Sequence, residues 1–317
     1  MRCVILDDYQ DVATSYADWS VLDDVEPVPL RDHLEGAALD AALAGAEIVV
    51  AMRERTPFPA SLLERLPDLR LLVTTGLRNA SIDLGAAASQ GVTVCGTESS
   101  SAPPVELTWA LIHGLTRHLL VEATGLRRGE RWQQTVGVEL QGARLGLVGL
   151  GKIGTRVAAV GQAFGMDVVA WSPHLTTERA AAAGVRAVAK DELMATSDVV
   201  SLHLVLSPST RGVIGADDLA LMKHTAFLVN TSRAGLVETD ALVDALREER
   251  IAGAGLDVYD VEPLPRDDVL RRLPNVLATP HLGYVSQDNY RRFFGQAVED
   301  IAAWQAGRPL RVLTAPH

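Results

Sequence analysis

Three glycines near the middle of the chain have a spacing that suits a dinucleotide. They occur as Gly-x-Gly-x-x-Gly, directly after a short apolar segment typical of a buried strand. In this arrangement the first glycine permits a tight turn, the second lets the backbone approach a pyrophosphate, and the third lets a helix pack closely. The N-terminus of that helix would receive the negative charge. The candidate cofactor-binding residues of this loop are Gly149, Gly151, Lys152, Ile153 and Gly154.

An incidental glycine turn is the alternative, because surface loops produce the same triplet by chance. The flanks favour the cofactor site. Residues 145–148 read as a strand, and apolar residues then recur at helical spacing from Ile153 to Val160.

Polar residues also follow three later apolar segments. Arg233 ends Val229-Asn-Thr-Ser-Arg, Glu262 follows the segment that contains Asp257, and His281 ends Ala278-Thr-Pro-His. Doubly wound folds build their sites at the ends of such strands. Each residue alone has an ordinary reading, as a surface ion-pair former, a solvated loop residue or a packed histidine. Their joint occurrence at strand ends favours a functional site.

Together with Thr75-Gly-Leu-Arg-Asn79, these segments resemble the D-isomer-specific 2-hydroxyacid dehydrogenases over nearly the whole chain. The order arginine, glutamate, histidine at family-like spacing is more specific than the glycine triplet. The resemblance implies an oxidoreductase that transfers a hydride between NAD(P)H and a 2-oxo acid, giving a D-2-hydroxy acid.

The residue types suit that reaction. Arg233 offers a planar fork for the substrate carboxylate. His281 can donate a proton to the developing alkoxide and act as the base in reverse, while Glu262 would favour the charged ring and fix its orientation. By resemblance, Asp257 would hydrogen-bond the nicotinamide carboxamide.

The first hundred residues supply the candidate substrate-binding residues. By resemblance, the backbone from Gly76 to Asn79 holds the other side of the substrate carboxylate. Arg53 and Arg78 follow strand-like segments and could face a cleft between two domains. The equally weighted alternative is that both are solvated loop arginines. The candidates are Arg53, Gly76, Leu77, Arg78 and Asn79.

Two departures from the family pattern matter. Ser172 stands where an acidic residue usually binds both ribose hydroxyls, so the repulsion that would exclude a 2′-phosphate is absent. The sequence therefore tolerates NADP and slightly favours it over NAD. Pro173 replaces a frequent arginine of NADP-preferring relatives, which leaves discrimination to His174, Thr176 or Arg179. The second departure is Ala234-Gly235 in place of Gly-Pro. The candidate cofactor-binding residues beyond the glycine loop are Ser172, His174, Thr231 and Asp257.

Alternating strand-like and helix-like segments must position these residues. Strand-like segments lie at 3–6, 47–51, 71–74, 92–95, 145–148, 168–171, 185–189, 199–203, 226–230, 252–256 and 276–278. Such alternation predicts parallel sheets. A breaker cluster at 99–104 precedes a helix expected over 105–126, and a last helix is expected over 289–307.

We therefore expect an α/β fold with two doubly wound domains. A flavodoxin-like substrate domain would comprise residues 1–100 plus 285–317, and a Rossmann NAD(P)-binding domain residues 101–284. A length of 317 residues fits two domains.

Composition narrows the class of protein. A net charge of −11 argues against nucleic-acid or anionic membrane partners, and no apolar run approaches the roughly 20 residues of a membrane span. We expect a cytoplasmic protein with Cys3 and Cys95 as buried residues. We expect no metal, because the other histidines lack a ligand arrangement. They are His33, His113, His118, His174, His203, His224 and His317.

The expected partners are a small 2-oxo or 2-hydroxy acid and a second copy of the chain. Trp132 matches a position where relatives pass an arm to the partner subunit, with a core tryptophan as the equal alternative. The rival function is a dinucleotide-sensing, corepressor-like binding protein. The lack of long disordered flanks in this sequence favours the enzyme.

Overall fold

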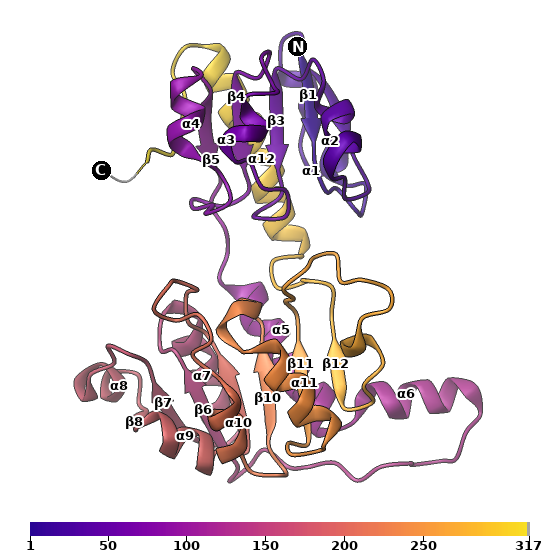
Figure 1. Ribbon diagram of the computed structural model, residues 1–317, viewed down its shortest axis with the longest axis vertical. Helices are drawn as coiled ribbons and strands as arrows, with labels where there is room; N and C mark the ends of the chain where they lie inside the picture. The colour runs from indigo at the N-terminus through magenta and orange to yellow at the C-terminus, as the bar shows by residue number, and fades with distance from the viewer. Residues whose placement is uncertain (316–317) are drawn as a thin grey trace. The chain divides into compact units, whose positions relative to one another are not determined.

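The computed structural model describes residues 1–315 and divides the chain into two compact units. The first unit comprises Met1–Ser100 and Val285–His317, and the second Ser101–Tyr284. Residues 1–100 and 285–315, at opposite ends of the described chain, therefore belong to one unit (Figure 1). In residues 1–315, no helix combines the length and apolar composition that crossing a membrane requires.

The first unit is a five-stranded parallel sheet in the order β2-β1-β3-β4-β5. Its strands are β1 (Arg2–Ile5), β2 (Glu26–Pro29), β3 (Ile48–Ala51), β4 (Leu71–Thr74) and β5 (Thr93–Gly96). Its helices are α1 (Ala13–Tyr16), α2 (Gly36–Leu43), α3 (Ala60–Leu63), α4 (Leu84–Ser89) and α12 (Gln287–Gln305), with a 3₁₀ turn at Trp19–Val21. This strand order is the flavodoxin-like order that the sequence predicted.

Helices cover both faces of this sheet. Alternate strand residues such as Val4, Val49 and Leu72 share a buried core with Leu39 and Leu63 of α2 and α3. On the other side α12 packs against β4, as Figure 1 shows. Parallel strands buried on both faces explain the nearly continuous apolar runs of this half of the sequence.

The second unit is a seven-stranded parallel sheet in the order β12-β11-β10-β9-β6-β7-β8. Its strands are β6 (Arg144–Val148), β7 (Asp167–Trp171), β8 (Arg186–Ala187), β9 (Val199–Leu202), β10 (Phe227–Asn230), β11 (Gly253–Leu256) and β12 (Val276–Ala278). Its helices are α5 (Ala102–Thr116), α6 (Leu119–Arg128), α7 (Lys152–Ala163), α8 (Thr177–Ala182), α9 (Lys190–Thr196), α10 (Ala216–Leu221) and α11 (Thr239–Arg247), with 3₁₀ turns at Ala234–Leu236 and Val269–Arg271. The order reverses at β6, which confirms the Rossmann arrangement.

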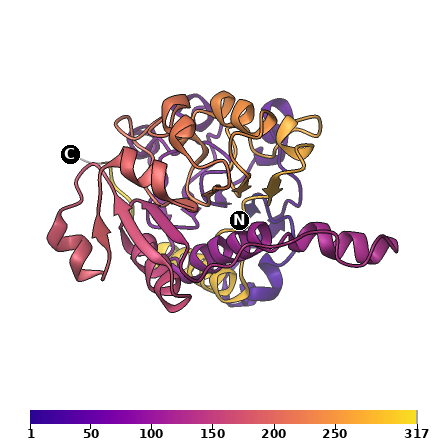
Figure 2. The same cartoon turned by 90° about the horizontal axis from the view of Figure 1, so that it is seen from below.

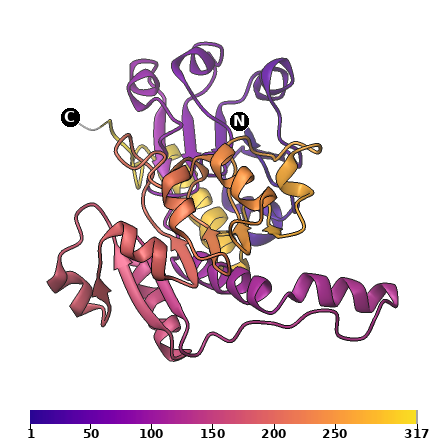
Figure 3. The ribbon, with the colours of Figure 1, turned by 60° about the horizontal axis from the view of Figure 1, so that its bottom comes forward.

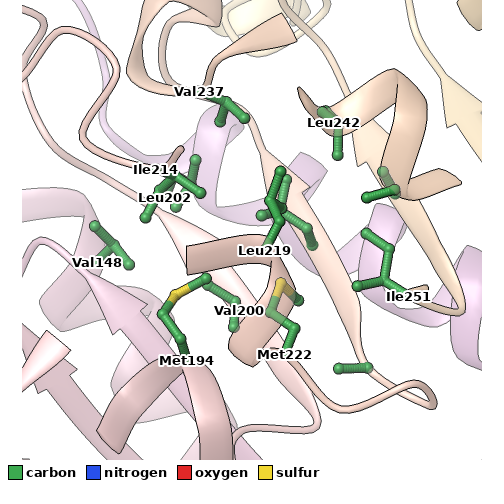
Figure 4. Close-up of a cluster of buried hydrophobic side chains, with 14 of the residues drawn as sticks. Val148, Met194, Val200, Leu202, Ile214, Leu219, Met222, Val237, Leu242 and Ile251 are labelled. Atoms are coloured by element: carbon green, nitrogen blue, oxygen red, sulfur yellow. The ribbon is translucent and has the colours of Figure 1, made fainter. Parts of the chain in front are cut away.

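Two buried cores flank this second sheet. Side chains of α5 and α7, such as Ile112 and Val157, pack with Leu147 on one face. Val148, the next residue of β6, points into the opposite core with residues of α9 and α10, such as Met194 and Leu219 (Figure 4). Buried side chains thus cover both faces of the sheet, so a binding site can form only on the loops at the strand ends.

Two elements differ from the sequence-based expectation. The single helix expected over 105–126 is divided into α5 and α6, because His118 adopts a left-handed backbone with φ of 48°. Strand β2 was missed because Pro27 and Pro29 weaken its strand signal. It lies at the edge of the sheet beside β1, and an edge strand tolerates proline.

Candidate active site

The glycine loop connects β6 to α7 by close backbone packing. Gly149 has φ of 108°, and a Cβ there would lie 2.7 Å from the carbonyl carbon of His203. A Cβ on Gly154 would lie 2.2 Å from the carbonyl oxygen of Gly149. Neither position accepts a side chain without movement of the backbone, so these two glycines fix the approach of the helix to the strand.

The N-terminus of α7 offers a place for a negatively charged group. Gly151 caps this 12-residue helix, and a Cβ added there would meet no atom within 4 Å. Lys152 is exposed and Ile153 half-buried in the first turn. Open space in front of unpaired helical N–H groups fits a dinucleotide pyrophosphate, so the loop present here suits the expected cofactor.

His203 lies beside this loop, where the sequence interpretation found only a histidine without a metal. It follows β9, the neighbour of β6 at the reversal of strand order, and its Nε2 lies 2.9 Å from Ser201 Oγ. Desolvation by burial lowers the pKa of His203 to about 4, so the ring is neutral at physiological pH. The signal that identified Arg233, a polar residue directly after an apolar strand, would have identified His203 as well.

Ser172 and His174 lie in the turn that follows β7. Ser172 is half-buried, and its carbonyl oxygen accepts a hydrogen bond from Leu175 N at 3.1 Å. His174 is exposed, and Arg179 Nη1 donates to its carbonyl oxygen at 3.2 Å. A hydroxyl and two basic side chains therefore border the carboxyl end of β7.

Arg233 lies in a turn after β10, and the side chain of Asn230 stabilises this turn through two hydrogen bonds to its backbone. Asn230 accepts from Ser232 N at 3.0 Å and donates to the Arg233 carbonyl oxygen at 2.9 Å. The guanidinium is half-buried, and its Nη1 donates to the Ser232 carbonyl oxygen at 2.8 Å. Thr231, in the same turn, has its hydroxyl 2.7 Å from that of Thr108 on α5. These bonds hold the cation at the carboxyl end of the sheet.

Glu262 and His281 form a hydrogen-bonded pair on the loops that follow β11 and β12. The Nδ1 atom of His281 lies 2.5 Å from one carboxylate oxygen of Glu262, and the other oxygen accepts from Tyr259 N at 2.9 Å. The ring also contacts Tyr284 edge to face, with centroids 5.5 Å apart. The carboxylate thus fixes the orientation of the ring, leaving Nε2 on the far side of the ring from Glu262.

Asp257 holds the loop that carries His281. One of its carboxylate oxygens accepts from the Thr279 hydroxyl and Leu282 N, both at 2.7 Å, and the other from Gly283 N at 2.8 Å. Burial raises the pKa of Asp257, and these hydrogen bonds oppose the rise. In the structure Asp257 therefore positions the loop that carries His281. Its contact with the carboxamide of the nicotinamide stays a prediction.

In the first unit, three of the five candidate substrate residues lie together. Arg53 Nη1 donates to the Thr75 carbonyl oxygen at 3.0 Å, and a Cβ on Gly76 would lie 1.9 Å from that same nitrogen. Asn79 is buried and donates to the Arg53 carbonyl oxygen at 2.6 Å. Leu77 and Arg78 are exposed on the same loop.

The remaining expectations concern single residues. Cys3 and Cys95 are free and fully buried. Trp132 is 75% exposed, so the reading of it as a core residue of this chain is wrong. Within the described part of the chain, no three His, Cys, Asp or Glu side chains gather in a way that could hold a metal ion, and His317 lies outside that part.

Comparison with known proteins agrees with this geometry. The sequence model of one family, described as "D-isomer specific 2-hydroxyacid dehydrogenase, NAD binding domain", matches residues 109–283. A glyoxylate reductase from Aeropyrum pernix is 34% identical over 307 residues, which cover 94% of this chain and 90% of that protein.

Two further relatives carry names that refer to phosphoglycerate. A D-3-phosphoglycerate dehydrogenase from Methanocaldococcus jannaschii is 35% identical over 92% of this chain, but the match spans only 55% of that protein. The crystal structure of a phosphoglycerate oxidoreductase from Vibrio cholerae has a TM-score of 0.92 and 39% identity, covering 97% of this chain and 99% of that one.

Proposed function

Because this chain belongs to the D-isomer-specific 2-hydroxyacid dehydrogenase family, we propose that it reduces 2-oxo acids to D-2-hydroxy acids with His281 as the proton donor. The chain is an oxidoreductase whose second unit binds a nicotinamide dinucleotide. The observation that carries the proposal is the contact between Nδ1 of His281 and a carboxylate oxygen of Glu262, which lie 2.5 Å apart on loops that follow β11 and β12. A histidine held in this way can give a proton to an alkoxide and take it back in the reverse reaction.

Each polar residue has one task in this proposal. Arg233 binds the substrate carboxylate through its planar fork. His281 donates the proton from Nε2, and Glu262 keeps the orientation of the ring through its bond to Nδ1. Asp257 keeps the His281 loop in place through its three hydrogen bonds. When bound, NAD(P)H supplies the hydride.

On the substrate side, we assign the carboxylate's second contact to the backbone around Gly76. Arg53 lies against this glycine, and Asn79 braces the loop by bonding to the Arg53 carbonyl oxygen. In this proposal the first unit is the substrate domain that carries the Gly76 loop, and the second unit binds the cofactor and carries Arg233 and His281.

For the cofactor, we infer that NADP is accepted and slightly preferred over NAD. Ser172 carries no charge that would repel a 2′-phosphate, and the turn that it begins is bordered by His174 and Arg179. These two basic residues support binding of a phosphate at the carboxyl end of β7.

We further infer a homodimer and a cytoplasmic location. Exposed apolar residues gather on α6 and the segment after it, in a part of the second unit that extends away from its sheet (Figures 2 and 3). A protein surface of this kind is typical of a contact with another chain. The location stays a prediction that the acidic composition and the free cysteines support.

A panel of 2-oxo acids, each assayed with NADH and with NADPH, tests the function directly. We expect steady-state turnover of at least one 2-oxo acid and the D-enantiomer of its product. A corepressor-like protein would bind the dinucleotide, as seen by nicotinamide fluorescence, but would turn over none of the acids. That outcome would replace the proposed enzyme with the binding protein.

A further inference from the structure

The chain that follows α12 runs back along the edge of the first unit's sheet. β5 ends the order β2-β1-β3-β4-β5, so it is an edge strand. Along it lies the return segment, residues 311–313. Gly96 N donates to the Arg311 carbonyl oxygen at 3.0 Å. Leu313 N donates to the Val94 carbonyl oxygen at 2.8 Å. The return segment therefore pairs with β5 in the antiparallel direction.

A buried ion pair anchors the return segment to α12. Arg311 Nε donates to Asp300 Oδ1 at 3.0 Å, and Asp300 is a fully buried residue of this helix. Arg311 Nη2 donates to the Gln296 carbonyl oxygen and to the exposed carboxylate of Glu299, both at 3.0 Å. Burial raises the pKa of Asp300 to about 6, and the charge of Arg311 opposes this rise. Separating the pair would leave a buried carboxylate uncompensated, so the anchor holds the return segment in place.

The side chain of Leu313 lies beside the loop that carries Gly76. Leu313 is half-buried and packs against the apolar core of the first unit. A Cβ on Gly96 would lie 2.5 Å from the Gly76 carbonyl oxygen and 3.3 Å from the Cα of Leu77. The same point lies 3.3 Å from Cδ1 of Leu313. Because Gly96 has no side chain to separate these groups, Leu313 and the backbone of the Gly76 loop are neighbours.

We propose that the return segment positions the Gly76 loop for the substrate, with Leu313 as the positioning residue and Arg311 as its anchor. The inference rests on the proposed function, in which the backbone around Gly76 makes the second contact with the substrate carboxylate. Backbone N–H groups that bind an anion must stay aimed at it, because a hydrogen bond weakens steeply as its angle closes. Loops move unless other elements hold them, and Leu313 limits the movement of this loop from the β5 side.

Kinetic constants for the 2-oxo acid that the parent turns over fastest test this role. Leu313→Ala removes the side-chain atoms beside the Gly76 loop. KM for the 2-oxo acid should rise about tenfold, the factor of one weakened hydrogen bond to a charged group. We expect kcat to change by less than about twofold, because the contact is made in the ground state and the transition state alike. The dissociation constant of the dinucleotide should equal that of the parent. A merely structural defect would instead lower kcat through loss of folded enzyme and leave KM unchanged.

Matched variants assign the effect to this contact. Leu313→Met conserves the volume of the side chain and should keep KM near the parent. Leu310→Ala removes the same atoms from an exposed residue just before the return segment and should leave KM unchanged. Arg311→Lys keeps the charge but loses the planar fork that bonds to α12 at several points, so KM should rise by a smaller factor than in Leu313→Ala. If thermal unfolding shows that Leu313→Ala does not fold, Arg311→Lys decides, and a parental KM in that variant overturns the inference.

The outcomes distinguish this inference from the proposed function. A parental KM in Leu313→Ala, an equal rise in Leu313→Ala and Leu310→Ala, or a fall in kcat alone overturns the role of the return segment while the dehydrogenase function stands. If the parent turns over no 2-oxo acid of the panel, the proposed function fails first and the inference falls with it.

Discussion

At the scale of single residues, Arg233 carries the positive charge that the substrate carboxylate requires. Arg233→Ala removes a charge-assisted bidentate contact from a half-buried site, a loss of several kcal/mol. We expect kcat/KM for reduction to fall roughly a thousandfold, while dinucleotide affinity measured by fluorescence hardly changes. The exposed Arg272 is the control, and Arg272→Ala should stay near the parent. Near-normal kcat/KM in Arg233→Ala would show that another group binds the carboxylate.

The Glu262–His281 pair predicts graded losses of activity. His281→Ala should nearly abolish reduction and leave NAD(P)H binding intact. Glu262→Gln keeps a side chain of the same size but removes the carboxylate that bonds to Nδ1 of His281. The ring is then held less firmly, so kcat/KM for reduction should fall, but by less than in His281→Ala. A Glu262→Gln enzyme with the kcat/KM of the parent would remove Glu262 from this role.

Ser172 tests the inferred cofactor preference. An aspartate at this position would accept hydrogen bonds from the ribose hydroxyls and place a negative charge against a 2′-phosphate. We expect Ser172→Asp to move the NADPH/NADH ratio of kcat/KM at least about tenfold toward NADH, or about 1.4 kcal/mol. Both cofactors are compared at one ionic strength. An unchanged ratio would mean that Ser172 does not face the ribose.

The sequence revealed some of these residues and hid others for one physical reason. Arg233 and His281 each follow an apolar strand along the chain, so a local pattern marks them. Leu313 and Gly76 are far apart along the chain and become neighbours only because the return segment pairs with β5. No spacing in the sequence indicates that meeting.

At the scale of secondary structure, elements with a local sequence pattern were also predicted, and elements without one were missed. Buried strands such as β4 have continuous apolar runs and were predicted at Leu71–Thr74, the bounds that the structure has. The edge strand β2 contains two prolines, and the break between α5 and α6 depends on one backbone angle at His118. Neither an edge position nor a single left-handed residue leaves a periodic signal, so both were missed.

The strand-to-helix turn of β6 and α7 predicts opposite effects for two of its glycines. Gly154→Ala places a Cβ 2.2 Å from the Gly149 carbonyl oxygen, and such overpacking costs about 1–3 kcal/mol of unfolding free energy. Gly151→Ala meets no atom within 4 Å, so its Tm without cofactor should match the parent. The methyl group would occupy the space for the pyrophosphate, and KM for the dinucleotide should rise about tenfold or more. Equal cofactor binding by Gly151→Ala and the parent would place the dinucleotide elsewhere.

At the scale of the whole molecule, α6 and the segment after it present a surface that water solvates poorly. Leu126 is 64% exposed, Trp132 75% and Val136 91%, and they lie on the extension that Figure 2 shows leaving the sheet of the second unit. All three lie within residues 126–136, and large exposed apolar patches are rare on monomeric proteins. The proposed homodimer would bury these residues against the same surface of a second copy, since a two-fold contact uses one patch twice.

The dimer is tested by its mass and by its dependence on concentration. Light scattering after size exclusion should give twice the chain mass of 33.9 kDa for the parent. Leu126→Asp combined with Val136→Asp places charges in the contact and should give 33.9 kDa, with a Tm that no longer rises with protein concentration. The control double variant, Val21→Asp with Leu221→Asp, adds the same charges to exposed apolar residues elsewhere and should stay dimeric. A monomeric parent, or a dimer that survives Leu126→Asp with Val136→Asp, would exclude this surface as the contact between subunits.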